Sequence, residues 1–210
     1  MPTRVKICGI TQWEDAQLAI ELGASALGFN FYPASPRYIA PDAAKAIILR
    51  LPPLVTAVGV FANEIDGAHI AAIARESGVT AVQVHGPKFP KADGTLAGFQ
   101  MIRAVAVSDG MKIEDLTLSG ACAYLLDAFD ADLPGGTGKT FDWTLARKAK
   151  QYGPIILAGG LTPENVSQAI REVRPYAVDV ASGVESSPGK KDAKKLRAFF
   201  AAVAKPDKGH

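Results

Sequence analysis

The chain has 210 residues and a mass of 22.0 kDa, enough for one domain that buries its own core without disulfides or metals. Its 23 basic and 21 acidic residues nearly balance, so charge does not indicate a nucleic-acid or membrane partner. No apolar run approaches the roughly 18 residues of a membrane span, the amino terminus lacks a signal-peptide pattern, and two cysteines are too few for a disulfide framework. These features predict a cytoplasmic protein.

Short runs rich in β-branched residues alternate with segments of helical period. In the first half we expect strands at 4–8, 26–31, 55–61 and 81–85. Thr11 and Glu14 form a capping-box pattern, which predicts a helix from there to about Leu22. A second helix is expected to begin near Pro41. A third is expected over 64–77, closed by Gly78.

The second half begins with a weak stretch, 86–98, where prolines and Gly94 leave room for a short helix at most. Another short helix is expected near 113–118. Further strands are expected at 99–105, 121–126, 154–157 and 177–181, with a helix at 143–152. Thr162 as N-cap and Pro163 at the first position predict the start of the next helix. Ala193, Leu196, Phe200 and Val203 form the apolar stripe of the last one.

Strict alternation of this kind predicts a parallel sheet with helices outside it. Eight units in about 200 residues favour a closed (βα)₈ barrel, the TIM barrel with eight parallel strands, although counting leaves an open doubly wound sheet possible. Since no linker interrupts the series, we expect a single domain over residues 1–204 and a frayed tail at 205–210.

The active sites of such barrels lie at the carboxyl ends of the strands. Glycines follow the seventh and eighth predicted strands, and glycine lets backbone N–H groups approach a ligand closely. These loops predict a phosphate site, the alternative being that the glycines only make tight turns. The residues at this rim are Cys8, Arg37, His85, Asp127, Gly136, Gly138, Gly159, Gly160, Asp179, Ser182 and Gly183.

The segment 135–140 (GGTGKT) ends like a nucleotide-binding P-loop, but its spacing is wrong. Leu133 stands where the motif needs a glycine, and residues 140–142 separate Lys139 from the next helix. We therefore expect a flexible lid over a substrate. Nor does any His, Cys and Asp cluster have metal-ligand spacing, so neither a metal nor another cofactor is predicted.

Cys8 and Asp127 are the candidate acid–base residues. A lone cysteine is usually a buried structural residue, and to act as a base Cys8 needs its pKa of about 8.5 brought towards the working pH. Cys122 begins the sixth strand, away from the rim, and is interpreted as structural. Asp127 ends an apolar strand, so it must face the mouth or a partner, and a protonated carboxyl there is a competent general acid. His85 is interpreted as structural or as a hydrogen-bonding group on the substrate side.

Eight strings along nearly the whole chain resemble those of the phosphoribosylanthranilate isomerase family, in the family's order and strand positions. They are KICGIT (6–11), FNFYPASPRYI (29–39), VGVFAN (58–63), VQVHG (82–86), LLDAF (125–129), GGTGKTFDW (135–143), LAGGLTPENV (157–166) and VDVASGVESSPGKKD (178–192). The sequence departs from the family mainly at 86–98, which puts the fourth helix in doubt.

The resemblance implies a cofactor-free (βα)₈ enzyme of tryptophan biosynthesis that rearranges N-(5-phosphoribosyl)anthranilate to 1-(2-carboxyphenylamino)-1-deoxyribulose 5-phosphate. It places the general base at Cys8 and the general acid at Asp127, with Arg37 at the anthranilate carboxylate and Asp179 near the substrate's polar groups. The phosphate contacts that it implies come from backbone around Gly136, Gly138, Gly159, Gly160, Ser182 and Gly183. The expected partner is thus a small phosphorylated substrate, and the chain is expected to be a monomer or a homodimer.

Two alternatives remain. A sugar-phosphate isomerase of histidine biosynthesis uses two aspartates, and Cys8 at the end of the first strand argues against it. A catalytically silent barrel that only binds a phosphorylated ligand is disfavoured by the intact pair of Cys8 and Asp127. An assay that follows loss of the fluorescent anthranilate substrate separates an active enzyme from a silent one.

Overall fold

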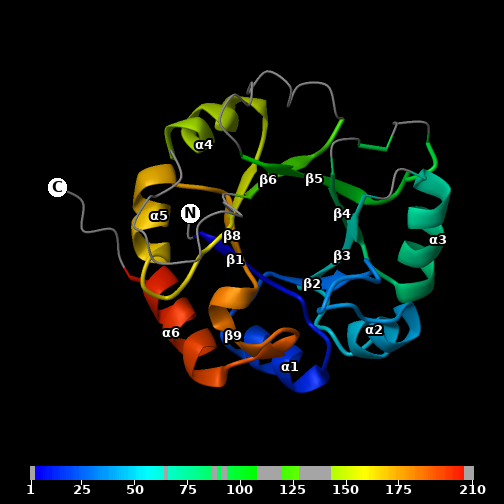
Figure 1. The fold of residues 1–210 in the computed structure, drawn as a ribbon, viewed down its shortest axis with the longest axis horizontal. Coiled ribbons are helices and arrows are strands. Elements are labelled where there is room, and N and C mark those ends of the chain that lie inside the picture. The colour runs from blue at the N-terminus through cyan, green and yellow to red at the C-terminus, as the bar shows by residue number, and fades with distance from the viewer. Residues whose placement is uncertain are drawn as a thin grey trace.

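Eight parallel strands close into a barrel in the computed structural model, which describes residues 3–63, 66–86, 89–90, 94–107, 120–127 and 143–205. In chain order and in neighbour order the strands are β1 (Arg4–Cys8), β2 (Ala26–Asn30), β3 (Thr56–Ala62), β4 (Ala81–His85), β5 (Gln100–Ala106), β6 (Ala123–Asp127), β7 (Ile155–Ala158) and β8 (Ala177–Val180). β8 pairs with β1 and completes the ring, which is seen end-on in Figure 1. The predicted (βα)₈ barrel is confirmed, and the open sheet is excluded.

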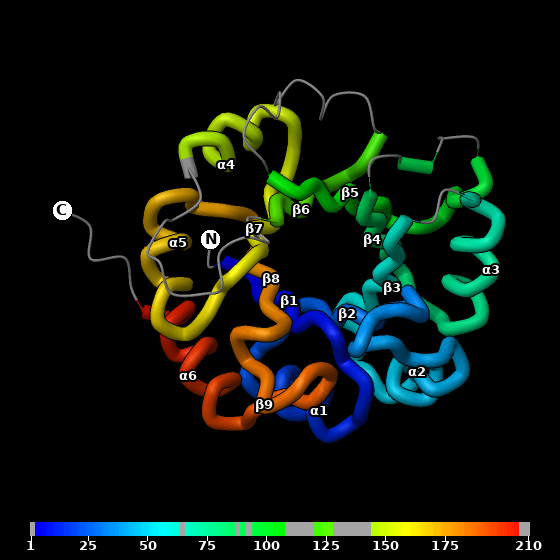
Figure 2. The backbone as a smooth tube through the Cα atoms, viewed as in Figure 1, coloured from blue at the N-terminus to red at the C-terminus, as the bar shows by residue number. Residues whose placement is uncertain are grey.

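Helices surround this ring (Figure 2). Those described are α1 (Trp13–Glu21), α2 (Pro41–Ile48), α3 (Gly67–Ser77), α4 (Trp143–Ala149), α5 (Val166–Val173) and α6 (Ala193–Val203). The 3₁₀ turn η2 (Lys150–Tyr152) extends α4. After β8 come the turn η3 (Ser182–Val184) and a small hairpin of β9 (Glu185–Ser187) and β10 (Lys190–Lys191). No helix in these described ranges is long and apolar enough to cross a membrane.

The core has two layers because side chains alternate between the two faces of each strand. Outward-facing residues such as Ile7, Leu126 and Leu157 belong to the same buried layer as Leu196 and Phe199 of α6. Inward-facing residues of the strands fill the barrel, including Val58, Ile102, Leu125 and Ile156. The apolar strand sequences are thus buried on both faces.

Polar residues interrupt the inner layer at Lys6, Gln83 and Asp179, whose exposures are 2%, 1% and 8%. In the register of β1 against β8, Lys6 stands opposite Asp179, so closing the barrel brings the two charges together. Buried charges need partners, and this pair supplies them. Gln83 and Asp179 lie near the carboxyl ends of the strands, where Cys8 and His85 also lie.

Two helices begin later than the capping patterns predict. α1 begins at Trp13 and Gln12 is its N-cap without a side-chain hydrogen bond, so the expected capping box is wrong. The Thr11 hydroxyl donates instead to the carbonyl of Gly189 in the distant hairpin. The helix expected from Thr162 is α5, which begins at Val166 because residues 163–165 form a turn.

The other helix boundaries follow local chemistry. α2 has Pro41 in its first turn, as expected. α3 begins at Gly67, three residues later than expected, where the Asp66 side chain accepts a hydrogen bond from the amide of Ala68, and it ends at Gly78 with φ +81°. The described residues between β4 and β5 contain turns and no helix. The helix expected near 113–118 lies outside the described residues, as do residues 206–210 of the expected tail.

Candidate active site

The predicted rim residues gather around a cavity of about 230 Å³ at the carboxyl ends of the strands. Cys8, Arg37, Asp127, Gly159, Gly160, Asp179 and Ser182 all line it. Asn30, Val60, Gln83, His85, Leu125 and several residues of the β7 and β8 ends complete its walls. Gly183 lies beside the cavity without lining it, and Gly136 and Gly138 lie outside the described residues. Residues that are distant in sequence therefore share one site.

Cys8 and Lys6 point into the barrel from β1, close to Asp179 of β8. Lys6 Nζ donates to Asp179 Oδ1 over 3.0 Å, and their side chains are 3% and 9% exposed. Burial lowers the pKa of Lys6, but attraction to Asp179 and Cys8 outweighs burial, so this pKa is raised and the ammonium stays charged. A Cβ on Gly28 would stand 2.9 Å from Cys8 Sγ and 3.1 Å from Lys6 Nζ, so only glycine leaves room for both groups.

The Cys8 thiol is harder to ionise than an ordinary cysteine thiol. Burial raises its pKa above the ordinary range of a cysteine thiol, and Asp179 adds to the rise. Lys6 and Lys191 lower the pKa and offset part of that effect. The site thus holds a mostly protonated thiol at neutral pH, with two cations placed to stabilise its thiolate.

Asp127 ends β6 and is half-buried on the side of the cavity formed by β6 and β7. Its register neighbours are Ala106 of β5 and Ala158 of β7, so small side chains flank the carboxyl group. Cys8 reaches the cavity from β1 and Asp127 from β6. A small molecule in the cavity therefore stands between a thiol and a carboxyl group.

Arg37 is held by a carboxylate that the sequence reasoning missed. Glu185 accepts hydrogen bonds from Arg37 Nε, at 3.0 and 3.1 Å, and from Nη2, at 2.6 Å. The same carboxylate accepts from Lys191 Nζ at 2.9 Å, and Lys191 Nζ also donates to the carbonyl of Cys8. Burial raises the pKa of Glu185, but Arg37 and Lys191 more than offset it, so the carboxyl is ionised at neutral pH.

His85 and Gln83 form the polar wall contributed by β4. The side chains meet at 2.7 Å between His85 Nε2 and Gln83 Nε2. Burial and the nearby Lys6 lower the pKa of His85 to about 4, so its ring is neutral at pH 7. Gln83 Oε1 is buried and has no hydrogen-bond partner among the described residues. This atom is therefore an acceptor that a bound hydroxyl can satisfy.

The loops after β7 and β8 fit tightly together. Gly159 and Gly160 have φ values of +85° and +62°, which favour glycine. Asn165 fastens the first loop, accepting from the amide of Thr162 and donating to the carbonyl of Gly160. A Cβ on Gly183 would stand 1.9 Å from the carbonyl oxygen of Leu161, so no side chain fits there. The two loops therefore bring backbone groups close together at the rim.

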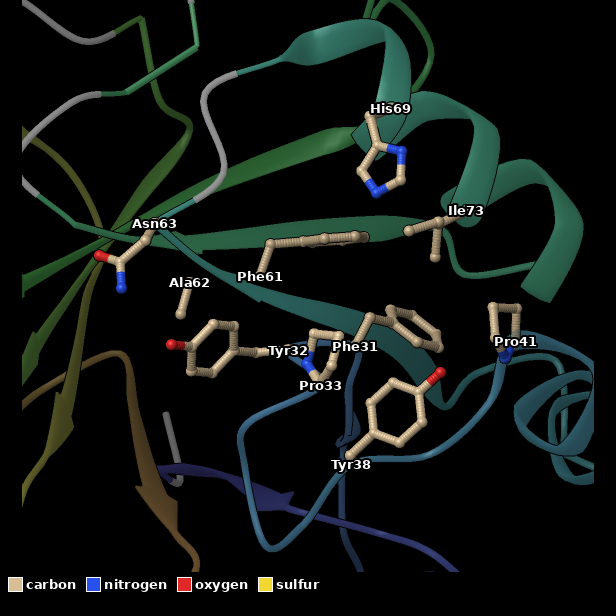
Figure 3. Close-up of a pocket in the computed structure, with 10 residues that line it drawn as sticks. All are labelled: Phe31, Tyr32, Pro33, Tyr38, Pro41, Phe61, Ala62, Asn63, His69 and Ile73. Carbon is tan, nitrogen blue, oxygen red and sulfur yellow. The ribbon is translucent and has the colours of Figure 1, made fainter.

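A larger cavity of about 490 Å³ lies on the other side of the barrel wall, between the ends of β2 and β3 and helix α3. Figure 3 shows aromatic rings around it, among them Phe31, Phe61 and Tyr38, with His69 above them. The Phe31 and Phe61 rings pack with centroids 5.4 Å apart. None of the described candidate site residues lines it. Both candidate acid–base residues, Cys8 and Asp127, line the smaller cavity, which is therefore the candidate active site.

The second cysteine lies far from the cavity. Cys122 is exposed just before β6, at the amino-terminal end of the barrel, so its interpretation as a buried structural cysteine is wrong. Its thiol donates to the carbonyl of Met101. A search of the described residues for metal-binding groups of three or more His, Cys, Asp or Glu side chains finds none.

A closed barrel with a thiol, a carboxyl group and glycine-rich loops at the carboxyl ends of its strands defines a (βα)₈-barrel enzyme of the kind that acts on small molecules there. The family model of N-(5'phosphoribosyl)anthranilate (PRA) isomerase matches residues 5–202. The chain belongs to this family.

Relatives and solved structures from this family match the chain along nearly its whole length. The N-(5'-phosphoribosyl)anthranilate isomerase of Geobacter metallireducens is 47% identical over 197 residues, which cover 94% of this chain and 96% of the relative. The crystal structure of the enzyme from Thermotoga maritima superposes with a TM-score of 0.85 at 44% identity, covering 96% of this chain and 98% of that one. Another structure, at 42% identity, a TM-score of 0.82 and the same coverage, holds reduced 1-(o-carboxyphenylamino)-1-deoxyribulose 5-phosphate. The T. maritima enzyme is dimeric.

Proposed function

We propose that this chain is a phosphoribosylanthranilate isomerase, which converts N-(5-phosphoribosyl)anthranilate to 1-(2-carboxyphenylamino)-1-deoxyribulose 5-phosphate in tryptophan biosynthesis. The reaction is an intramolecular aldose–ketose isomerisation, so it needs proton transfers and no net oxidant. The observation that carries the proposal is that Cys8 and Asp127 line one cavity with Arg37 and the glycine-bearing loops. Family membership over residues 5–202 supports the substrate.

The general acid in this proposal is Asp127. In its protonated form it donates to the ring oxygen of the ribose, which opens the furanose and leaves a Schiff base to the anthranilate nitrogen. Cys8, as thiolate, then takes the proton from C2′ and gives the enolamine, which tautomerises to the ketone. Because both groups act on one bound molecule, positioning contributes to the rate beside acidity. Each proton transfer is worth about 10²–10⁴ in rate.

Substrate binding divides between the two sides of the cavity. Arg37 meets the anthranilate carboxylate, since a guanidinium binds a carboxylate through two parallel hydrogen bonds. The phosphate binds to backbone groups around Gly136, Gly138, Gly159, Gly160, Ser182 and Gly183. The tight contact between Gly183 and Leu161 supports this assignment, because it brings the loops after β7 and β8 close together. Asp179 lies near the polar groups of the sugar, and its carboxyl group accepts a hydrogen bond from Lys6 there. No cofactor is part of this mechanism.

The experiment follows loss of substrate fluorescence in the purified protein and in Asp127→Asn. The parent protein should consume N-(5-phosphoribosyl)anthranilate, and Asp127→Asn should turn over about 10²–10⁴ times more slowly while its circular dichroism stays unchanged. A folded parent that leaves the substrate untouched refutes the function. A folded Asp127→Asn variant of near-normal rate removes Asp127 from the role of acid.

We also propose that the chain forms a homodimer, as the T. maritima enzyme does. Leu49 and Leu54, in the segment between α2 and β3, are 77% and 91% exposed. Leu54 borders a cavity of about 330 Å³ at the amino-terminal end of the barrel. Leu54 shares the lining of this cavity with Tyr176, which is 47% exposed, and adjoining exposed apolar side chains can mark a protein interface. Light scattering should give the dimer mass for the parent and the monomer mass for Leu54→Asp.

The proposed function also bears on the domain organisation, the location and the partners of the chain. We propose one domain over residues 1–204, a cytoplasmic location that fits a biosynthetic role, and no membrane or nucleic-acid partner. Limited proteolysis tests the domain: it should remove the segment 205–210 and leave one stable core. Cell fractionation tests the location.

A further inference from the structure

The hairpin of β9 and β10 contacts two loops: the one after β1, which follows Cys8, and the one after β2, which contains Arg37. Thr11, after β1, donates to the carbonyl of Gly189, and the amide of Lys191 donates to Asp15 of α1 over 2.8 Å. A Cβ on Gly189 would stand 3.3 Å from Thr11 Cγ2 and 3.5 Å from the carbonyl of Pro36, the residue before Arg37. In Figure 1 the hairpin overlaps α1, the helix that its Lys191 amide contacts through Asp15. The hairpin is thus packed against both loops.

Glu185 is the charged centre of this contact. Its side chain is 4% exposed, and its carboxylate joins Arg37 and Lys191, whose side chains are 23% and 0% exposed. The amide of Gly189 donates to the same carboxylate over 3.3 Å. A carboxylate accepting from two cations and an amide has little freedom to move. The arrangement therefore fixes the guanidinium in space.

Among the described residues, the hydrogen bonds of Arg37 use one edge of its guanidinium and not the other. A guanidinium has five N–H donors in a planar fork. Glu185 takes the edge formed by Nε and Nη2. The end formed by Nη1 and the second hydrogen of Nη2 remains, and that pair matches the two oxygens of a carboxylate. Arg37 borders the active-site cavity, and its stem packs on Gly9, where a Cβ would stand 2.7 Å from Cδ.

We propose that Glu185 is a positioning residue that orients Arg37 to bind the aromatic carboxylate of the substrate. This inference rests on the proposed function, in which Arg37 meets that carboxylate. Glu185 is not among the residues that line the cavity, so it acts on the substrate through Arg37. It lowers the conformational freedom that Arg37 would otherwise lose on binding, which is how a preorganised site gains affinity.

The test measures KM and kcat for Glu185→Gln with two substrates, N-(5-phosphoribosyl)anthranilate and its aniline analogue, which lacks the carboxylate. We expect KM for the first substrate to rise about tenfold with kcat within about twofold of the parent, and KM for the aniline analogue to stay unchanged. Glu172→Gln, the same substitution at an exposed glutamate of α5, is the control and should match the parent with both substrates.

A double-mutant cycle separates the inference from the function beneath it. Arg37→Ala should raise KM for the anthranilate substrate, and adding Glu185→Gln to it should change KM no further. If Arg37→Ala leaves KM unchanged, the proposed carboxylate contact is wrong. If Arg37→Ala raises KM and folded Glu185→Gln leaves it within twofold, the positioning role of Glu185 is overturned.

Glu185→Asp covers the case in which Glu185→Gln does not fold, because it keeps the charge beside buried Lys191. Its carboxylate is one methylene shorter and cannot reach Lys191 and both Arg37 nitrogens together. It should therefore keep the parent's melting temperature within a few degrees and still raise KM for the anthranilate substrate alone. A folded Glu185→Asp variant with the parent's KM contradicts the proposal.

Discussion

Lys6 is expected to control how readily Cys8 ionises, and Lys6→Met tests this by removing the nearest cation. Because Cys8 Sγ and Lys6 Nζ would stand 2.9 and 3.1 Å from one Cβ on Gly28, they are no more than about 6 Å apart. At an effective dielectric constant of about 20, unit charges at that distance attract by about 3 kcal/mol. Losing that attraction lowers the thiolate fraction at a given pH by about 100-fold.

The assay is the rate at which Cys8 reacts with an aromatic disulfide reagent at pH 8, in a Cys122→Ser background so that one thiol reports. A less acidic thiol is intrinsically more nucleophilic, with a Brønsted coefficient of about 0.4–0.5, which returns about tenfold of the loss. We therefore expect Lys6→Met to react about tenfold more slowly than its parent.

Asp179 supplies the control, since Lys6→Met alone leaves that buried carboxylate without its partner. Breaking such a pair costs about 3–5 kcal/mol of stability, so the rate is measured under conditions where circular dichroism shows the folded form. The double variant Lys6→Met/Asp179→Asn should recover much of both the stability and the reactivity, because it removes both charges. A folded Lys6→Met variant that reacts as fast as its parent refutes the electrostatic account.

Three further expectations concern other parts of the site. The pKa of His85 is lowered to about 4 in the folded protein, so as pH falls from about 6.5 the histidine is protonated in the unfolded chain first. The protein should therefore lose about 3 kcal/mol of stability between pH 6.5 and 4. Urea unfolding should show a smaller loss of stability over this pH range in His85→Gln. Equal pH slopes in the two proteins contradict this. Gly183→Ala forces the loops after β7 and β8 apart, so it should weaken competitive inhibition by inorganic phosphate at least tenfold and lower the free energy of unfolding by about 1–3 kcal/mol. A Cβ at Gly160 meets no atom within 4 Å, so Gly160→Ala should cost only about 1 kcal/mol of stability, through backbone strain. Unchanged inhibition in Gly183→Ala argues against a phosphate site there. A dimeric Leu54→Asp variant contradicts the proposed interface.

The strands were predictable because each is a short run rich in apolar and β-branched residues, and the boundaries are off by no more than two residues at either end. Helix starts were less predictable because tertiary contacts compete for the capping side chains. The Thr11 hydroxyl bonds Gly189, 178 residues away, instead of its own helix. Local sequence cannot reveal that competition.

The strand-end residues could be placed at one rim from the barrel pattern alone, and their shared cavity follows that placement. The charged residues that pair with them, such as Lys6 and Glu185, could not be predicted from that pattern. Lys6 and Asp179 are 173 residues apart and Arg37 and Glu185 are 148 apart, so only the closed ring and the hairpin bring them together. One signal was present in the sequence, since Lys6 occupies an inward position of an apolar strand, where a charge needs a partner.

The most direct test of the acid–base account is the turnover of N-(5-phosphoribosyl)anthranilate by Cys8→Ala beside Cys122→Ala, each followed by loss of substrate fluorescence. Cys8 lines the active-site cavity, whereas Cys122 is exposed at the other end of the barrel. The account predicts that Cys8→Ala falls by about 10²–10⁴ in kcat with its fold intact, and that Cys122→Ala keeps the parent's rate. A folded Cys8→Ala enzyme with a near-normal kcat contradicts it.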